Sequence, residues 1–290
     1  MTGAAARGAA GAFPADGAVA VQRSLTWVEG PDAAGFLHGL LSNDIDGLAT
    51  GSDRPALLLD AKGHIVASVT VHRDAEDAFT LITEPHLATA LTDALHRYHF
   101  SEDLEVIGPE PARALVVAAA TPDPPGAEMV VDGLTPGTRE ALTDDPEAAV
   151  AALGLRAVPA DVLERARIAA GAVRVGVDTG PTTLVQEAAL EDVAVSFEKG
   201  CYLGQETVAR AQFRGRVNRV LRMLRMETAP GALPAPVIAG GKTVGALTST
   251  APDGEGRIGL AIIRREVAPG SRVTVGEGAG AVVCEVPPGG

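Results

Sequence analysis

The stretch KGCYLGQE, residues 199–206, places Cys201 between two glycines and beside Lys199, just before a segment that reads as an arginine-bearing helix. A nearby lysine and a helix N-terminus both favour the thiolate form of a cysteine. Cys201 is therefore a candidate nucleophile, redox thiol or transient ligand of iron or sulfur. The plainer alternative is a small apolar residue in a loop. The only other cysteine is Cys284.

The other side chains of this stretch have both functional and structural interpretations. Tyr202 can stack against a flat heterocycle or anchor the loop in the core, and anchoring is the commoner role of an isolated tyrosine. Gln205 and Glu206 can bind the polar edge of a heterocycle or cap backbone amides, since a carboxylate in a first helical turn is favourable in itself. Gly200 and Gly204 allow sharp turns and close approach of the backbone to a neighbour.

The longer segment 195–210 resembles the signature of YgfZ-type folate-binding proteins, which belong to the aminomethyltransferase (glycine-cleavage T-protein) superfamily. A match of this length, with Cys, Tyr, Gln and Glu in order, is more specific than a short glycine pattern. Further matching segments occur along residues 20–286. They resemble an opening helix, a hairpin, a helix ending, the start of the second half and a C-terminal strand, at 30–44, 57–65, 97–100, 167–171 and 245–249.

The resemblance implies a fold, a ligand and a function. The fold is α+β, with two interlocked antiparallel-sheet and helix subdomains around a central folate channel and a small C-terminal β-barrel. The ligand is tetrahydrofolate, and the function is support of the assembly or repair of iron–sulfur clusters, with client enzymes or assembly factors as partners. Cys201 and Lys199 are implied as the working residues. The residues implied to hold folate are Tyr202, Gln205, Glu206, Glu187, Arg210 and Asn43.

Two other functions remain open from the sequence. The first is a folate-dependent one-carbon enzyme such as an aminomethyltransferase. Those enzymes carry acids after the first hairpin and a glutamate in a later segment, where this chain has Ala67, Ser68 and Ala169. General acid–base catalysis therefore lacks its carboxylates. The second is a protein-interaction function that uses the basic face of residues 210–225, with no small ligand.

Composition narrows the class of protein. The chain of 290 residues has a net charge of −13, which argues against general nucleic-acid binding. It has no apolar run near the length of about 18 residues that a membrane span needs, and its cysteines form no disulfide framework or metal-binding pair. We therefore expect a cytoplasmic protein without nucleic-acid or membrane partners. The segment 196–226 is an exception, because its seven basic and two acidic residues suit either a solvated face or an anion-binding surface.

Sequence patterns predict five regions along the chain. Residues 1–18 are rich in alanine and glycine and predict a disordered extension. Residues 19–120 alternate apolar strands and helices, which predicts an N-terminal α+β folate-binding subdomain. Residues 121–150 are acidic and rich in proline and glycine, as is typical of a linker. Residues 151–230 predict a second α+β subdomain that carries the motif, and the short β-rich runs of 231–290 predict a small barrel.

Overall fold

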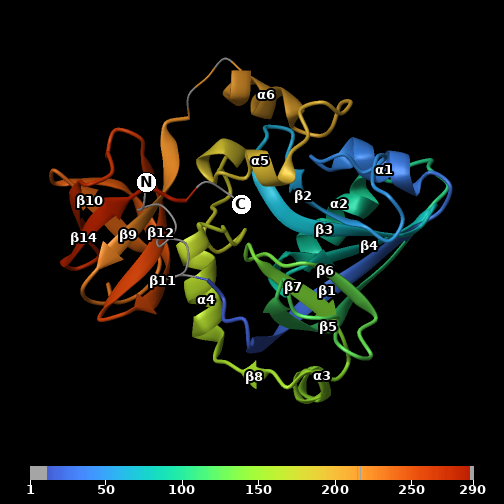
Figure 1. Cartoon of the computed structure of the whole chain (residues 1–290). Coiled ribbons are helices and arrows are strands. Elements are labelled where there is room, and N and C mark those ends of the chain that lie inside the picture. The colour runs from blue at the N-terminus through green and yellow to red at the C-terminus, as the bar shows by residue number, and fades with distance from the viewer. Residues whose placement is uncertain (1–11, 214, 216, 288–290) are drawn as a thin grey trace, which may run out of the picture.

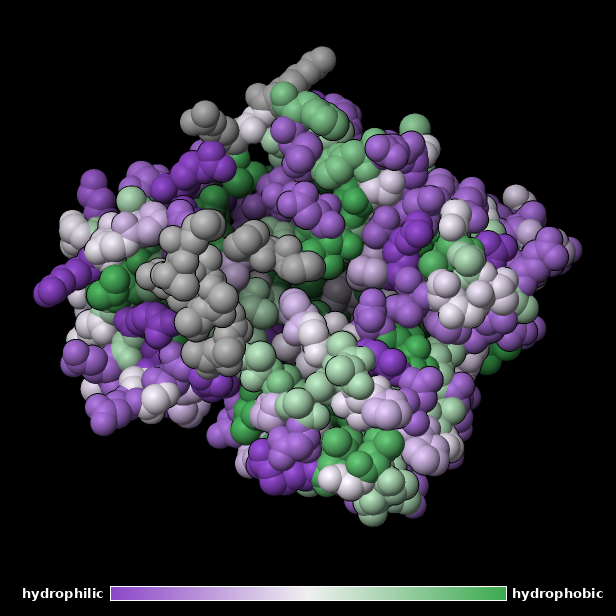
Figure 2. Space-filling model, in the orientation of Figure 1, coloured by the Kyte–Doolittle hydropathy of each residue, from purple (hydrophilic) through white to green (hydrophobic). Residues whose placement is uncertain are grey.

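The computed structural model describes residues 12–213, 215 and 217–287. The first half of the chain forms a large open sheet and its end forms a closed barrel (Figure 1). Helix α4 (Ala160–Ala170) lies between the sheet and the barrel. The predicted α+β class with a small C-terminal barrel is confirmed. Hydrophilic residues cover much of the face seen in Figure 2, as the net charge of −13 leads one to expect.

The large sheet has the strand order β2-β3-β4-β1-β5-β7-β6, and each neighbouring pair along this path is antiparallel. The short strand β8 pairs in parallel with the start of β1. Buried and half-exposed residues alternate along β3, as expected for a sheet with one face against the core. The strands are β1 (Gly17–Glu29), β2 (Asp53–Leu59), β3 (Ile65–Ala75), β4 (Ala78–Thr83), β5 (Glu105–Ala118), β6 (Met129–Asp132), β7 (Thr138–Leu142) and β8 (Arg156–Ala157).

Two helices cover one face of this sheet. Leu37 of α1 and Leu91 and Leu95 of α2 are completely buried in the same core as the side chains of β3 and β4, because helical spacing places the leucines on one side. No helix in the described part of the chain is long and apolar enough to cross a membrane. The helices are α1 (Ala33–Leu40), α2 (Ala88–Tyr98), α3 (Pro146–Leu153), α4, α5 (Glu191–Ala194) and α6 (Gln205–Phe213), with the 3-10 turns η1 (Pro85–Leu87) and η2 (Val185–Glu187).

The barrel has the order β10-β11-β12-β9-β14-β13 and is closed by pairing of β13 with β10. Leu224, Leu247 and Ile263 fill its interior. Leu221 and Leu260, on the outside of the barrel, belong to the main core, so the barrel is packed against the rest of the molecule. Its strands are β9 (Arg219–Met226), β10 (Ala235–Ala239), β11 (Lys242–Asp253), β12 (Gly256–Arg264), β13 (Arg272–Val275) and β14 (Ala279–Cys284).

The barrel begins with β9 at Arg219, earlier than the predicted boundary at residue 231. Three arginines obscure the strand pattern of β9, in which Leu221 and Met223 face the main core whereas Leu224 faces the barrel interior. Part of the basic segment is therefore a structural strand with apolar residues on both faces. It is not a continuous basic surface.

Two other predicted regions differ from the structure. Most of the predicted extension, residues 1–11, lies outside the described residues, but Phe13 is buried and β1 already begins at Gly17. Residues 121–150, predicted as a linker, contain β6 and β7 of the large sheet and the start of α3. These strands have only four and five residues. The acidic, proline-rich loops between them give the whole segment the composition of a linker.

Candidate functional site

Cys201 is exposed in the loop that leads into α6. The helix begins at Gln205, so three residues separate the thiol from the first helical turn. The thiol is thus near the helix N-terminus, as predicted, but not within it. Cys284 on β14 is half-buried, and its sulfur lies 3.8 Å from the carbonyl oxygen of Val282. Both cysteines are free, and Cys201 is the exposed one of the two.

Close backbone packing fixes this loop on the hairpin between β2 and β3. Gly204 has a φ of +81°, and a Cβ at this position would lie 2.5 Å from the carbonyl oxygen of Asp60. Gly63, in the hairpin turn, has a φ of +79°, and a Cβ there would lie 2.8 Å from the Cβ of Thr207. Only glycine tolerates both the positive φ and the close approach. Contact between loop and hairpin therefore explains Gly204.

Lys199 fastens the same loop to the end of α1. Its ammonium donates hydrogen bonds to the backbone carbonyl oxygens of His38, of Leu41 at 2.7 Å and of Asn43 at 2.9 Å. Carbonyls at a helix C-terminus lack helical partners and favour a nearby cation. An ammonium has three donors, so none is left for the thiol of Cys201. Lys199 therefore positions the loop, and its influence on the thiol is limited to charge at a distance.

Burial shifts the pKa values of two neighbours of Cys201, Lys199 and Tyr202. It lowers the pKa of Lys199 from 10.5 to about 8, against the opposing effect of the Asp44 and Asp46 carboxylates. The lysine nitrogen lies 5.1 Å from the centre of the Tyr202 ring. Tyr202 is itself buried, and burial raises the pKa of its hydroxyl to about 12. These contacts favour the anchoring interpretation of Tyr202 over stacking on a ligand.

Asn43 and Gln205 complete the support of the loop. The backbone carbonyl of Asn43 accepts a hydrogen bond from Lys199, and its side-chain amide donates to a carbonyl of β2 at 2.8 Å. Gln205 is half-buried at the start of α6, and its backbone N–H donates to the carbonyl of Tyr202 at 3.2 Å. The structure thus brings Asn43 and Tyr202 together at Lys199, two residues before Cys201, in roles that hold the loop.

The other residues predicted to hold folate do not converge with these. Glu206 and Arg210 form an ion pair on the outer side of α6, with 84% and 67% of their side chains exposed. Glu187 accepts a hydrogen bond from the backbone N–H of Leu184 at 3.2 Å and so caps η2. Their observed partners are local, and none of the three lines a cavity described below.

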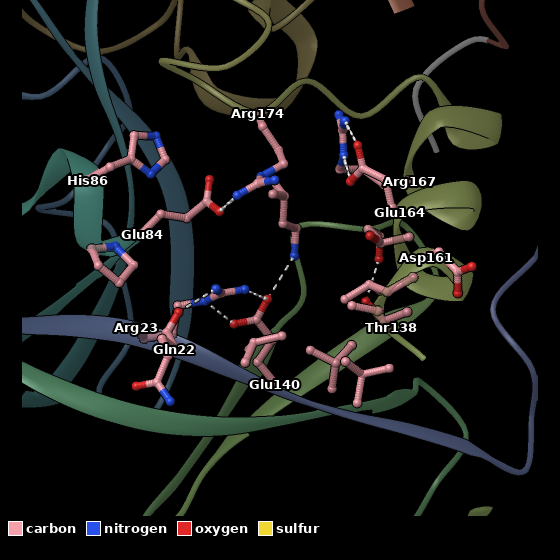
Figure 3. A pocket seen from close by; sticks show the side chains of 18 residues that line it. Gln22, Arg23, Glu84, His86, Thr138, Glu140, Asp161, Glu164, Arg167 and Arg174 are labelled. Atoms are coloured by element: carbon pink, nitrogen blue, oxygen red, sulfur yellow. Dashed lines mark hydrogen bonds and ion pairs between the residues drawn. The ribbon is translucent and has the colours of Figure 1, made fainter. Parts of the chain in front are cut away.

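A separate cavity of about 650 Å³ lies between the large sheet and α4. Its walls come from β1, β5 and β7, from the start of η1, from α4 and from the loop that follows α4 (Figure 3). None of the predicted site residues lines it. The charged and titratable side chains in its wall are Arg23, Glu84, His86, Glu140, Asp161, Glu164, Arg167 and Arg174.

Two arginine–glutamate pairs in the cavity wall are fully formed. Arg23 on β1 donates through Nε and Nη2 to the two oxygens of Glu140 on β7, each at 2.6 Å. Burial by itself lowers the pKa of Arg23, but the carboxylate of Glu140 outweighs it and raises the pKa above the usual value. Within α4, Arg167 donates to both oxygens of Glu164, at 2.9 and 2.6 Å. All four carboxylate oxygens are therefore engaged.

In the third arginine–glutamate pair of the wall, Arg174 with Glu84, only one of the two carboxylate oxygens accepts a hydrogen bond from a described residue. Arg174 donates through Nε at 3.0 Å and Nη2 at 2.7 Å to one oxygen of Glu84, Oε1. In the described part of the chain, the other oxygen, Oε2, is buried without a hydrogen-bond partner. Figure 3 shows Glu84 and Arg174 reaching toward each other at the side of the cavity. This carboxylate therefore retains an acceptor that the protein itself does not use.

A buried network joins α4 to the barrel beside this cavity. The side chain of Asp178 is completely buried and accepts hydrogen bonds from Arg167 at 2.8 Å and from the backbone N–H of Arg174 at 2.9 Å. It also accepts from the hydroxyls of Thr248 at 2.7 Å and Ser249 at 2.5 Å on β11. A buried carboxylate with four donors is fully satisfied, so the network holds the barrel against α4.

The cavity could not be predicted from the sequence because the residues that line it are far apart in the chain. Arg23 and Glu140 are separated by 117 positions, and Glu84 and Arg174 by 90. One local signal of the cavity exists in the sequence. Glu84 directly follows the apolar strand β4, and a charged side chain beside a buried strand is unfavourable unless another group pairs with it.

Among the described residues, no group of three or more His, Cys, Asp or Glu side chains is arranged to hold a metal ion.

No family model matches the chain. An uncharacterized protein of Haemophilus influenzae is 29% identical over 216 residues, which cover 71% of this chain and 72% of that protein. The tRNA-modifying protein YgfZ of Edwardsiella ictaluri is 30% identical over 223 residues, which cover 68% of this chain and 67% of that protein. The mitochondrial iron-sulfur cluster assembly factor IBA57 of Mus musculus is 29% identical over 305 residues, which cover 91% and 83% of the two chains.

A solved structure shares the fold. The glycine cleavage system aminomethyltransferase T of Bartonella henselae matches with a TM-score of 0.77, over 93% of this chain and 85% of that chain. The sequence identity is 22%, so the likeness shows the architecture of sheet, helices and barrel and leaves the chemistry to be argued from the residues.

Proposed function

The chain belongs to the YgfZ family of the aminomethyltransferase superfamily, and on this premise we propose that it is an accessory protein for the assembly or repair of iron–sulfur clusters. Cys201 is its working thiol and tetrahydrofolate is its ligand. Its partners are iron–sulfur client enzymes or other assembly factors. It works in the cytoplasm, where cysteines are kept reduced.

The observation that carries the proposal is an exposed thiol on a loop held from three sides. Lys199 ties the loop to α1, Gly204 fits against the hairpin, and Tyr202 is anchored in the core. Thiolates are preferred ligands of iron–sulfur clusters. Cys201 can lose its proton to solvent, bind an iron atom of a client's cluster, and be released by reprotonation, with no change of oxidation state. The name of the related assembly factor supports this role.

An aminomethyltransferase-like enzyme is the weaker alternative. Chemistry on a folate-bound carbon needs a positioned acid or base. The positions where the resemblance places those carboxylates hold Ala67, Ser68 and Ala169, and Ala67 is completely buried. Folate binding without the transferase reaction therefore suits these residues better.

The cavity between the sheet and α4 fits tetrahydrofolate in size and chemistry. Its volume of about 650 Å³ lies within the range of about 300–1,000 Å³ that is usual for pockets of small ligands. Val19, Val21 and Leu163 offer apolar contact for a flat ring system, and the charged side chains of the wall offer polar contact for its edge. Tetrahydrofolate carries one-carbon units, and the role of these residues is to bind and orient it. The residues that the resemblance implied for folate, Tyr202, Gln205, Glu206, Glu187, Arg210 and Asn43, lie outside this cavity, and their role in binding folate stays a prediction.

Complementation tests the cluster function. In a bacterial strain that lacks its own family member, the activity of an iron–sulfur dehydratase is measured relative to an enzyme without a cluster. We expect the wild-type chain and Cys284→Ser to restore this ratio, and Cys201→Ser to leave it at the deletion level. The protein level and circular dichroism spectrum of Cys201→Ser serve as controls. Full restoration by Cys201→Ser would remove the thiol from the proposed function.

A further inference from the structure

We propose that Glu84 binds the N–H edge of the pterin ring and that Arg174 positions its carboxylate for this contact. The inference rests on tetrahydrofolate being the ligand of the cavity, as proposed above. It concerns which residue of this chain supplies the hydrogen-bond acceptor for the pterin ring. Ala67, Ser68 and Ala169, which stand where related enzymes carry carboxylates, have no carboxylate to supply.

The pterin ring presents a ring N–H next to an exocyclic amino group. The two donors point the same way, so a single carboxylate oxygen that faces them can accept from one or both of them through its two lone pairs. A cavity that selects this ring therefore needs an ionised carboxylate with a free oxygen in its wall. Hydrogen bonds to a charged acceptor are about twice as strong as neutral ones.

Four carboxylates line the cavity, and three of them are poorly suited. Both oxygens of Glu140 and both oxygens of Glu164 accept hydrogen bonds from arginines. Asp161 is exposed on the first turn of α4, where water competes for its oxygens. Glu84 alone of the four combines burial, with 12% of its side chain exposed, and an oxygen without a partner.

The contact with Arg174 leaves one oxygen of Glu84 available to accept a hydrogen bond from a ligand. Arg174 binds Oε1 only, so the contact holds the Glu84 side chain in place while Oε2 remains unused. A buried acceptor without a donor is unfavourable until something supplies one. The last torsion of a glutamate is soft, so a small rotation turns Oε2 toward the cavity. The side chain of Arg174 is 34% exposed, which leaves room to follow this rotation.

Calorimetry with tetrahydrofolate tests the inference. We expect Glu84→Gln to bind it at least about tenfold more weakly than wild type, because an amide replaces the charged acceptor. The control is Glu147→Gln, which makes the same change in an exposed Arg113–Glu147 pair outside the cavity. Its affinity should stay within twofold of wild type. Thermal unfolding establishes that both variants are folded.

A second measurement changes the ligand and keeps the protein intact. Tetrahydrofolate in which a methyl group replaces the exocyclic amino group lacks one of the two donors. Wild type should bind this analogue at least about tenfold more weakly, and Glu84→Gln should bind both ligands alike. Equal affinity of wild type and Glu84→Gln for tetrahydrofolate would overturn the role of Glu84 and leave the folate ligand standing. Absence of binding by wild type overturns both, while the complementation with Cys201→Ser still decides the cluster function.

Discussion

Replacing Asp178 by alanine should loosen the attachment of the barrel and lower the stability of the whole chain. The Asp178 carboxylate is completely buried and accepts four hydrogen bonds, two of them from hydroxyls on β11. Its removal leaves Arg167, with 3% of its side chain exposed, facing an empty site. Breaking a buried ion pair by removing one partner costs about 3–5 kcal/mol.

The loss of unfolding free energy in Asp178→Ala depends on which contacts of Arg167 remain. Arg167 keeps its contacts with Glu164, which is 28% exposed, so part of its charge stays compensated. Losses of hydrogen bonds within one network are not additive, so we expect about 4 kcal/mol for Asp178→Ala. Asp178→Asn keeps the shape and some acceptor capacity, and should lose about half as much. Glu255→Ala, at an exposed turn of the barrel, should change stability by less than about 0.5 kcal/mol.

Urea unfolding measures these differences. The fluorescence of Trp27, the single tryptophan, follows the large sheet, and far-ultraviolet circular dichroism follows all the secondary structure. Coincidence of the two transitions in wild type would permit a single free energy of unfolding. A loss below about 1 kcal/mol for Asp178→Ala, or one equal to that of Glu255→Ala, would refute the assignment of this network as the link between α4 and the barrel.

Three further predictions concern the motif. Gly204→Ala should lower the free energy of unfolding in urea by about 3 kcal/mol, because it combines a positive φ with a close contact. Gly231→Ala, with a similar φ in open space, should lower it by about 1 kcal/mol. Equal losses of stability would contradict the packing argument. Lys199 has a pKa lowered from 10.5 to about 8, so the folded state binds fewer protons than the unfolded state between these values. The stability of wild type relative to Lys199→Met should therefore rise with pH across that window, and a flat difference would exclude the shift. Glu206→Gln and Arg210→Gln should each leave the affinity for tetrahydrofolate within twofold of wild type in calorimetry, since both side chains are exposed. A tenfold loss would instead support their predicted role in holding folate.

Local patterns predicted the parts of the fold that depend on neighbouring residues. The hairpin at 57–65 and the helix after residue 204 were both expected, and the structure has both; Gly63 takes the positive φ of the hairpin turn. The barrel was predicted from its short strands, but β9 was missed because its arginines mask the alternation. The strands β6 and β7 were missed because strands of four and five residues between proline-rich loops resemble a linker.

The site was predictable only in part, for a physical reason. Cys201 was predicted to be a reactive, accessible thiol, and its exposure is local information that a glycine-flanked loop carries. The partners of Lys199 are more than 150 positions away, so its role in holding α1 could not be inferred from its place beside the cysteine. The cavity depends on pairs such as Glu84–Arg174, which only the folded chain brings together.

The most direct test of the central claim is the repair of a purified client. An iron–sulfur dehydratase is inactivated by oxidation, and its recovery is timed with ferrous iron and a thiol reductant, with and without this protein. Wild type and Cys284→Ser should accelerate recovery equally, whereas Cys201→Ser should give the rate seen without the protein. Acceleration by Cys201→Ser equal to that of wild type would contradict the account of Cys201 as the working thiol.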